Sequence, residues 1–168
     1  MKLNKFILLF LPIFLIAFNC NETTSKNSNL PTFFVTENSK KITFAEFAKD
    51  NVVFVNFWAT WCAPCIDEIP DIIQLSNEYK NKNVKFLGIS IDEGSDAIQL
   101  VEEFKTQYKI PYTIIIDKNQ EIQKAFGGMR GIPTTFIIAK NGKITDKLLG
   151  LRSKEVFAGV INKAINIK

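Results

Sequence analysis

Two cysteines with two residues between them are the groups in this sequence best suited to chemistry: Cys62 and Cys65, separated by Ala63 and Pro64. Residues 52–57, shortly before them, form a run that is apolar and β-branched apart from Asn56, a pattern typical of a strand buried on both faces. A helical pattern begins directly after the pair. A C-x-x-C at such a strand-to-helix junction indicates thiol–disulfide redox chemistry.

The helix predicted after the cysteines is amphipathic, because its apolar residues recur every three or four positions. These residues are Ile66, Ile69, Ile72, Ile73 and Tyr79. The helix N-terminus brings unpaired backbone N–H groups and a positive dipole end to Cys62, which favours the thiolate form. Cys65 lies one turn further on, within disulfide reach, and can resolve a mixed disulfide. Pro64 suits an early helical position, where a missing N–H costs nothing.

Two other interpretations of the cysteines stay open. One is a purely structural disulfide, although closing so short a loop stabilises a fold little. The other is half of a zinc site, although the chain has no histidine and only one further cysteine, Cys20. We therefore expect no metal site, and no cofactor beyond a redox-active Cys62–Cys65 disulfide.

Residues 55–65, Val-Asn-Phe-Trp-Ala-Thr-Trp-Cys-Ala-Pro-Cys, resemble the active-site segment of the thioredoxin superfamily. More narrowly, they resemble the TlpA/ResA-like branch of membrane-associated thiol–disulfide oxidoreductases. This resemblance implies a thioredoxin fold over nearly all of residues 31–168. It also implies a reductant of protein disulfides that receives electrons from a membrane partner, with apocytochrome c as the best-known substrate class of the branch.

Residues 132–135, Ile-Pro-Thr-Thr, resemble the proline loop of the same superfamily. The resemblance implies a cis bond before Pro133, packing of this loop against the cysteines, and presentation of the Ile132 backbone to an extended substrate chain. The alternative is a proline that only opens a strand. Trp61 is expected to shield the disulfide and to contact substrate, whereas Trp58 fits either the site or the core.

Glu68, three residues after Cys65, allows two interpretations. In the ResA-like branch a glutamate at this position lies half-buried beneath the cysteines, which implies a pKa raised towards neutrality and a role as proton acceptor for Cys65 through water. The alternative is an exposed glutamate that the helix dipole favours. Asn56 stands where ordinary thioredoxin carries a buried aspartate, a departure that fits the same branch and assigns proton transfer to Glu68.

The N-terminus has the pattern of a targeting segment. Lys2 and Lys5 form a positive region, and the apolar run Phe6–Phe18 is shorter than the ~20 residues of a membrane-spanning helix. We expect residues 1–19 to be a signal peptide. Cys20 resembles the lipidated cysteine of a bacterial lipoprotein, and an uncleaved short anchor or ordinary cleavage are the alternatives. All three predict a domain outside the cytoplasm on a membrane face, held there by a lipid anchor if Cys20 is acylated.

Residues 20–30 are polar and lack an apolar period, so we expect a flexible tether that ends where a domain at 31–168 begins. The formal net charge is +4, and removing Lys2 and Lys5 with the leader leaves +2. The remaining basic residues are scattered along the chain. This charge argues against a nucleic-acid or acidic-surface partner.

Periodicity predicts an α/β chain with a mixed sheet and helices on both faces. Strands are expected at 33–36, 41–44, 52–57, 84–91 and 112–116, within 131–138, and at 143–149. Asn141-Gly142 between the last two apolar runs is a strong hairpin signal. Helices are expected at 44–48, from the cysteines to about 81 with a kink at Pro70, and at 95–108, 121–126 and from Ser153 onwards. The strand and helix within 84–108 resemble the insert that distinguishes the TlpA/ResA branch from plain thioredoxin.

Two further functions compete with a reductase. A peroxidase of the peroxiredoxin type shares the fold, but it needs a single peroxidatic cysteine with an arginine beside it. A non-catalytic binding module or chaperone on a thioredoxin scaffold would not need both cysteines and Pro133.

Overall fold

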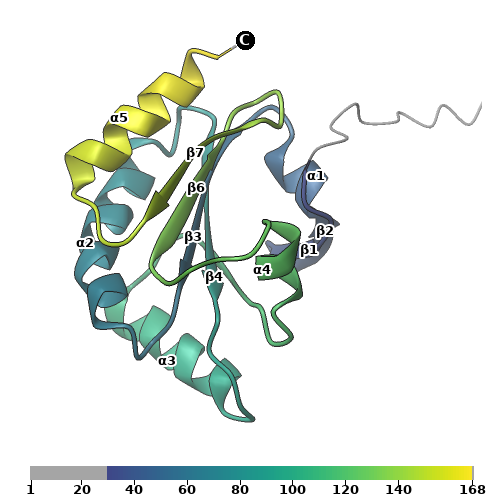
Figure 1. The fold of residues 1–168 in the computed structure, drawn as a ribbon, viewed down its shortest axis with the longest axis vertical. Coiled ribbons are helices and arrows are strands. Elements are labelled where there is room, and N and C mark those ends of the chain that lie inside the picture. The colour runs from purple at the N-terminus through teal and green to yellow at the C-terminus, as the bar shows by residue number, and fades with distance from the viewer. Residues whose placement is uncertain (1–29, 168) are drawn as a thin grey trace, which may run out of the picture.

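The structure is a computed structural model that describes residues 30–167 (Figure 1). Its strands are β1 Phe34–Glu37, β2 Lys40–Thr43, β3 Val52–Trp58, β4 Val84–Ser90, β5 Thr113–Ile116, β6 Thr134–Ile138 and β7 Ile144–Leu149. Its helices are α1 Phe44–Ala48, α2 Ala63–Glu78, α3 Ala97–Tyr108, α4 Glu121–Ala125 and α5 Lys154–Ile165. The predicted signal peptide at 1–19, Cys20 and most of the predicted tether lie outside the described residues.

Strand β3 is the centre of a five-stranded mixed sheet with the order β5-β4-β3-β6-β7. It pairs parallel with β4 and antiparallel with β6, and every one of its residues is buried. Helix α2 joins β3 to β4 and α3 joins β4 to β5, which are the crossover connections that parallel pairs require. The predicted mixed α/β sheet is therefore confirmed.

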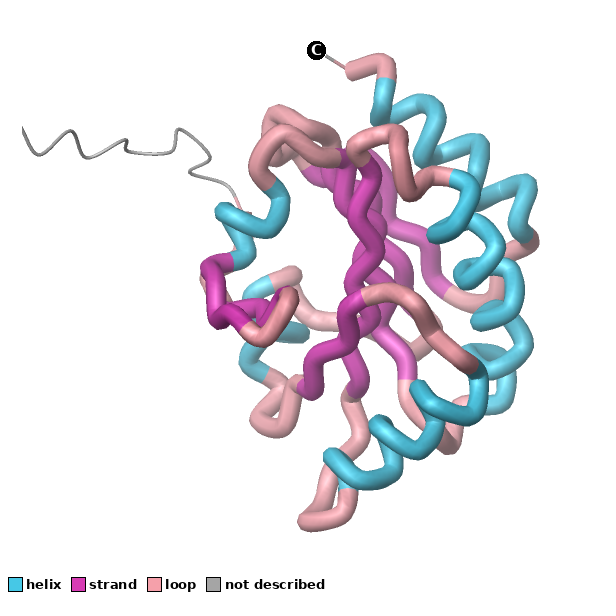
Figure 2. The backbone as a smooth tube through the Cα atoms, turned by 180° about the vertical axis from the view of Figure 1, so that it is seen from behind, coloured by secondary structure: helices cyan, strands magenta, loops and turns pink. Residues whose placement is uncertain are grey.

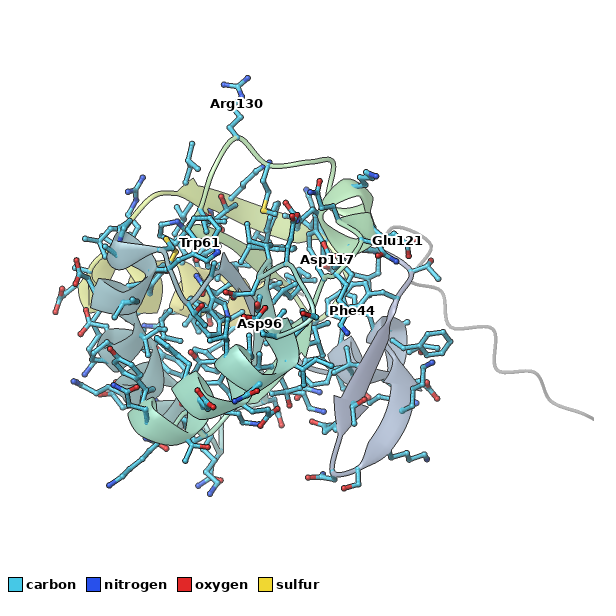
Figure 3. All side chains as sticks on the ribbon, turned by 90° about the horizontal axis from the view of Figure 1, so that it is seen from below. Phe44, Trp61, Asp96, Asp117, Glu121 and Arg130 are labelled. Carbon is cyan, nitrogen blue, oxygen red and sulfur yellow. A yellow bond between two sulfur atoms is a disulfide. The ribbon has the colours of Figure 1, made fainter. Side chains whose placement is uncertain are left out.

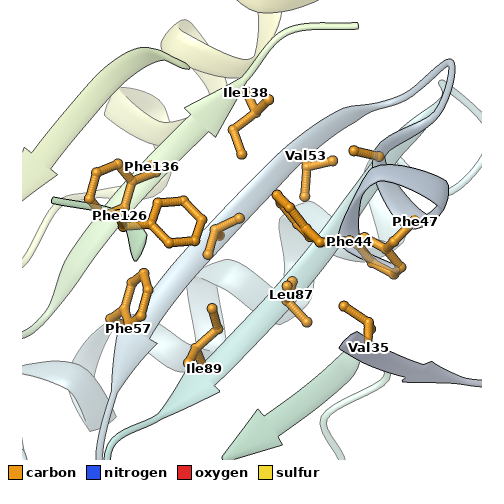
Figure 4. Close-up of a cluster of buried hydrophobic side chains, with 12 residues drawn as sticks. Val35, Phe44, Phe47, Val53, Phe57, Leu87, Ile89, Phe126, Phe136 and Ile138 are labelled. Atoms are coloured by element: carbon orange, nitrogen blue, oxygen red, sulfur yellow. The ribbon is translucent and has the colours of Figure 1, made fainter. Parts of the chain in front are cut away.

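The two faces of the sheet are covered differently. Figure 2 shows the three long helices, α2, α3 and α5, on one face, and the short helices α1 and α4 with the β1–β2 hairpin on the other. Strand β3 contributes side chains to the hydrophobic core on each face of the sheet, because successive side chains of a strand point to opposite faces. On the α1 and α4 side, Val53 and Phe57 pack with Phe44 and Phe47 (Figure 4). Phe54, on the opposite face, packs among residues of α2 and α5.

Local signals explain where several elements begin and turn. Thr43 accepts a hydrogen bond from the Glu46 backbone N–H while the Glu46 carboxylate accepts one from the Thr43 backbone N–H, so a capping box starts α1. Asn141-Gly142 turns β6 into β7 as predicted, with Gly142 at a φ of 80°. Helix α2 continues through Pro70 as one helix and ends at Glu78, a little earlier than the sequence predicted.

The buried face of α3 is narrower than its apolar period indicates. Ile98 fits the apolar period of α3, but it is 50% exposed. Only the narrow stripe of Ala97, Val101 and Phe104 reaches the core, because α3 packs along a single i, i+4, i+7 line. Ser153 occupies the N-cap position of α5, yet its side chain makes no capping hydrogen bond.

Within residues 30–167, no helix combines the length and apolar character needed to cross a bilayer.

Candidate active site

Cys62 and Cys65 form a disulfide at the junction between β3 and α2. The S–S distance is 2.06 Å and the Cα atoms are 5.2 Å apart. Cys62 is the N-cap residue of α2, and its carbonyl oxygen accepts hydrogen bonds from the backbone N–H groups of Cys65 and Ile66. Both sulfurs therefore sit in the first turn of a helix, where free amides and the helix dipole favour negative charge.

The two cysteines differ in their access to solvent. Cys62 is 5% exposed and Cys65 is fully buried, so the sulfur that a large partner can reach is that of Cys62. Trp61, directly before it, is 67% exposed and is labelled in Figure 3. Trp58 is buried and packs on the ring of Phe104, with 4.9 Å between centroids, so Trp58 belongs to the core.

Glu68 lies in the second turn of α2 and is only 1% exposed, so the interpretation as an exposed glutamate is wrong. Its Oε1 accepts a hydrogen bond of 2.8 Å from Asn56 Nδ2. Its Oε2 has no hydrogen-bond partner among the described residues. Glu68 is thus a buried carboxyl group with one oxygen held and one oxygen unpaired.

Burial raises the pKa of Glu68 from its ordinary value of 4.5 to about 7. The hydrogen bond from Asn56 and the backbone and positive charge of Arg152 oppose this rise, while the negative charge of Asp71 adds to it. A carboxyl group with such a pKa exchanges its proton near neutral pH, which is what a proton relay requires. Arg152 lies 84 positions from Glu68 in the chain, so only the fold brings these two residues close enough to interact.

The proline loop meets the cysteines from the side of β6. The Ile132–Pro133 bond is cis, as the resemblance implied. Ile132 packs against the cluster that contains Cys62 and Cys65. The carbonyl of Pro133 accepts a hydrogen bond of 2.7 Å from the Gly150 backbone N–H, whereas no backbone hydrogen bond is recorded for Ile132 within residues 30–167. The backbone of Ile132 is therefore free to pair with another strand.

Asn56 connects the loop strand to the active-site helix. Its Nδ2 donates both to Glu68 Oε1 and, at 3.1 Å, to Thr135 Oγ1, two residues after Pro133. All three side chains are buried. Hydrogen bonds between buried side chains thus join β3, α2 and β6, about one turn of α2 beyond Cys65.

A second polar cluster, which sequence reasoning missed, holds the turn before Cys62. The buried carboxylate of Asp92 accepts hydrogen bonds from the backbone N–H of Thr60 at 3.1 Å and from the Thr60 hydroxyl. It also accepts a hydrogen bond of 2.7 Å from the Ser90 hydroxyl. Asp92 therefore fastens the segment leading to Trp61 and Cys62 onto the end of β4.

No group of three or more His, Cys, Asp or Glu side chains within reach of one metal ion occurs in the described part of the chain. Cys20, for which lipidation was predicted, lies outside that part.

The sequence matches the model of the AhpC/TSA family over residues 26–147. It is 37% identical over 134 residues to the thiol-disulfide oxidoreductase ResA of Bacillus thuringiensis (strain Al Hakam), an alignment that covers 79% of this chain and 75% of that protein.

Solved structures show the same architecture. A thiol:disulfide interchange protein of the thioredoxin family from Chlorobium tepidum TLS superposes with a TM-score of 0.71 at 32% identity, over 82% of this chain and 95% of that one. StoA from Bacillus subtilis superposes with a TM-score of 0.65 at 23% identity, over 78% and 97% of the two chains, and at that identity supports the fold alone.

Proposed function

The chain belongs to the AhpC/TSA family, and relatives that it matches are thiol–disulfide oxidoreductases; we propose that it reduces disulfides of substrate proteins. The reacting groups in this proposal are Cys62 and Cys65. The observation that carries the proposal is the Cys62–Cys65 disulfide in the first turn of α2, with the more accessible sulfur on Cys62.

The reaction starts from the dithiol form. The Cys62 thiolate attacks one sulfur of the substrate disulfide, forms a mixed disulfide and displaces the other substrate sulfur as a thiolate, which takes up a proton. The Cys65 thiolate then attacks the Cys62 sulfur and releases the second substrate sulfur. The substrate gains two electrons and two protons, and the protein is left with the Cys62–Cys65 disulfide, which a reductant must open again.

Glu68 is the proposed acceptor of the Cys65 proton, through a water molecule. Its pKa of about 7 and the unpaired Oε2 support this role. Because Cys65 is buried, its proton needs an internal acceptor. Glu68 suits that task in a way that an exposed carboxylate would not.

Trp61, Ile132 and Pro133 are the proposed substrate-binding residues. The exposed indole of Trp61 offers apolar contact area beside Cys62. The unpaired backbone of Ile132 offers hydrogen bonds to an extended substrate segment, which would add as a strand beside the proline loop. Pro133 removes an N–H from the loop and holds Ile132 in position.

We further propose a membrane-tethered location outside the cytoplasm, with residues 1–19 removed as a signal peptide and Cys20 acylated. The support is the pattern of charge and hydropathy at the N-terminus. A membrane protein would then donate the electrons, and apocytochrome c is a candidate substrate. The intact mass of the protein from the membrane fraction tests the anchor. A mature chain that begins well past Cys20 and carries no acyl mass refutes it.

An insulin-reduction assay with peroxide turnover measured alongside separates the competing functions. We expect insulin reduction that is lost in Cys62→Ser, and no peroxide turnover above the rate of a free thiol. Peroxide turnover without insulin reduction would support a peroxidase, and the absence of both activities would support a binding module.

Trapping substrates on Cys62 in cells with a Cys65→Ser variant then identifies the physiological partner, because the mixed disulfide is no longer resolved.

A further inference from the structure

A pocket with two cations in its wall lies beside the proline loop. Its volume is about 310 Å³, and Arg130, Thr134, Lys147 and Leu149 line it. Two of these residues are basic and none is acidic. We call it the basic pocket.

The charge of Arg130 in this pocket is not compensated. Arg130 is exposed and projects away from the body of the protein (Figure 3). Within residues 30–167 its side chain has no ion pair, and no hydrogen bond of it is recorded. Lys147 is held in place, because its Nζ donates to the Gly128 carbonyl oxygen at 3.1 Å and lies over the ring of Phe136. Neither cation meets a carboxylate.

The basic pocket adjoins the segment that is proposed to pair with substrate. Thr134 directly follows Pro133, and Leu149 lies opposite Thr134 in the β6–β7 ladder. Arg130 precedes Ile132 by two residues. Because Thr134 and Arg130 each lie two residues from Ile132, a substrate strand that pairs beside Ile132 carries some of its side chains past the pocket.

We propose that the basic pocket makes this reductase prefer substrates that carry Asp or Glu close to the reactive disulfide. This inference rests on the proposed function. The substrate carboxylate accepts hydrogen bonds from the Arg130 guanidinium, lies near the Lys147 ammonium, and packs its methylene groups on Leu149. Exposed ion pairs are weak, so the expected preference is about three- to tenfold at low salt and fades as salt screens the charges.

Matched disulfide peptides test this. The peptides share one sequence and one disulfide, and a single position, moved from one to four residues from the cysteine, is Glu, Gln or Lys. For reduction by the dithiol form of the full chain, kcat/KM is expected to follow the order Glu, Gln, Lys at low salt and to converge at high salt, with the difference mainly in KM. The variant Arg130→Glu leaves Lys147 as the one cation beside a new carboxylate, so it is expected to abolish the difference between the Glu and Lys peptides.

Lys143→Glu is the matched control, because it makes the same kind of charge reversal at the opposite end of the β6–β7 hairpin. It should keep the order of the three peptides. Equal rates for the Glu and Lys peptides at every position, or equal effects of Arg130→Glu and Lys143→Glu, overturn the inference and leave the reductase function standing. Reduction of none of the peptides, by a protein whose dithiol form has been verified, overturns both.

Discussion

Asn56 donates a hydrogen bond of 2.8 Å to Glu68, and both side chains are buried, with Glu68 about one turn of α2 beyond Cys65. An amide N–H stabilises the ionised form of a carboxyl group, whereas burial stabilises the neutral form. The two effects together hold the pKa of Glu68 near neutrality, at about 7. The behaviour of this pair with pH is the most direct test of the site.

Replacing Glu68 with Gln should change stability in a pH-dependent way. The pKa of Glu68 is raised from 4.5 to about 7, so the folded protein holds this proton more tightly than the unfolded chain does. Its contribution to stability is complete below pH 4.5 and is lost as pH rises through about 7. The stability of Glu68→Gln relative to the original protein should therefore increase between pH 4 and pH 8 by about 3 kcal/mol. Urea unfolding of the oxidised form at both pH values measures this difference, and an equal difference at both would contradict it.

The same variant should slow disulfide exchange. Above pH 7 the Glu68 carboxylate accepts the Cys65 proton, and Gln cannot do so. We expect the resolution step to slow by about ten- to a hundredfold, with loss of the rate inflection near pH 7. Stopped-flow mixing with a disulfide peptide across pH 5–9 measures both effects. If Glu68→Gln keeps the inflection of the rate near pH 7, that inflection belongs to a group other than Glu68.

Replacing Asn56 with Leu should raise the pKa of Glu68 further, because the hydrogen bond from Asn56 Nδ2 to Glu68 Oε1, which favours the ionised form, is removed. One such bond is worth about 1.5 kcal/mol, so the inflection of the rate should move upward by about one pH unit. Thr135→Val is the control, since it removes the other acceptor of Asn56 Nδ2 and leaves the bond to Glu68 intact. The inflection in that variant should stay near the original value.

Asp92→Ala should destabilise the fold and disturb the turn that carries Trp61. The substitution leaves the Thr60 backbone N–H and hydroxyl and the Ser90 hydroxyl without their acceptor. Loss of these buried partners should cost about 2–4 kcal/mol in thermal or urea unfolding. The neighbouring Glu93 is exposed, so Glu93→Ala should stay within about 0.5 kcal/mol of the original protein. Equal losses of stability in both variants would contradict the stabilising role of the hydrogen bonds that Asp92 accepts from Thr60 and Ser90.

Two glycines should respond in opposite ways to alanine. A Cβ on Gly88 of β4 would lie 3.1 Å from Trp58 Nε1 and 3.2 Å from Ile114 Cγ1, so Gly88→Ala should cost about 1–3 kcal/mol by overpacking. A Cβ on Gly159 of α5 would meet nothing within 4 Å, and Gly159→Ala should stabilise the helix by about 0.5–1 kcal/mol. Melting temperatures of the two variants should move in opposite directions.

Local patterns were sufficient to predict most of the fold. The β-branched run at 52–57 predicted β3, because a strand buried on both faces has few other compositions. Asn141-Gly142 predicted the hairpin through its turn chemistry. The spacing of Cys62 and Cys65 predicted a disulfide at a helix N-terminus, because that pairing spans a single turn. Each of these features depends on residues that are close together in the chain.

Tertiary packing decided which side chains near the cysteines are buried and which are exposed. Whether Glu68 is exposed or buried cannot be read from α2 alone, since the answer depends on Asn56 in β3 and on Arg152 before α5. Ile98 fitted the apolar period of its helix but stayed exposed, because the neighbours of α3 cover only one narrow stripe. The sequence by itself determined a redox pair at the start of a helix. Only the tertiary structure decided the pKa of Glu68, its place as proton acceptor and the residues that surround the proline loop. These depend on contacts between segments that are distant in the chain.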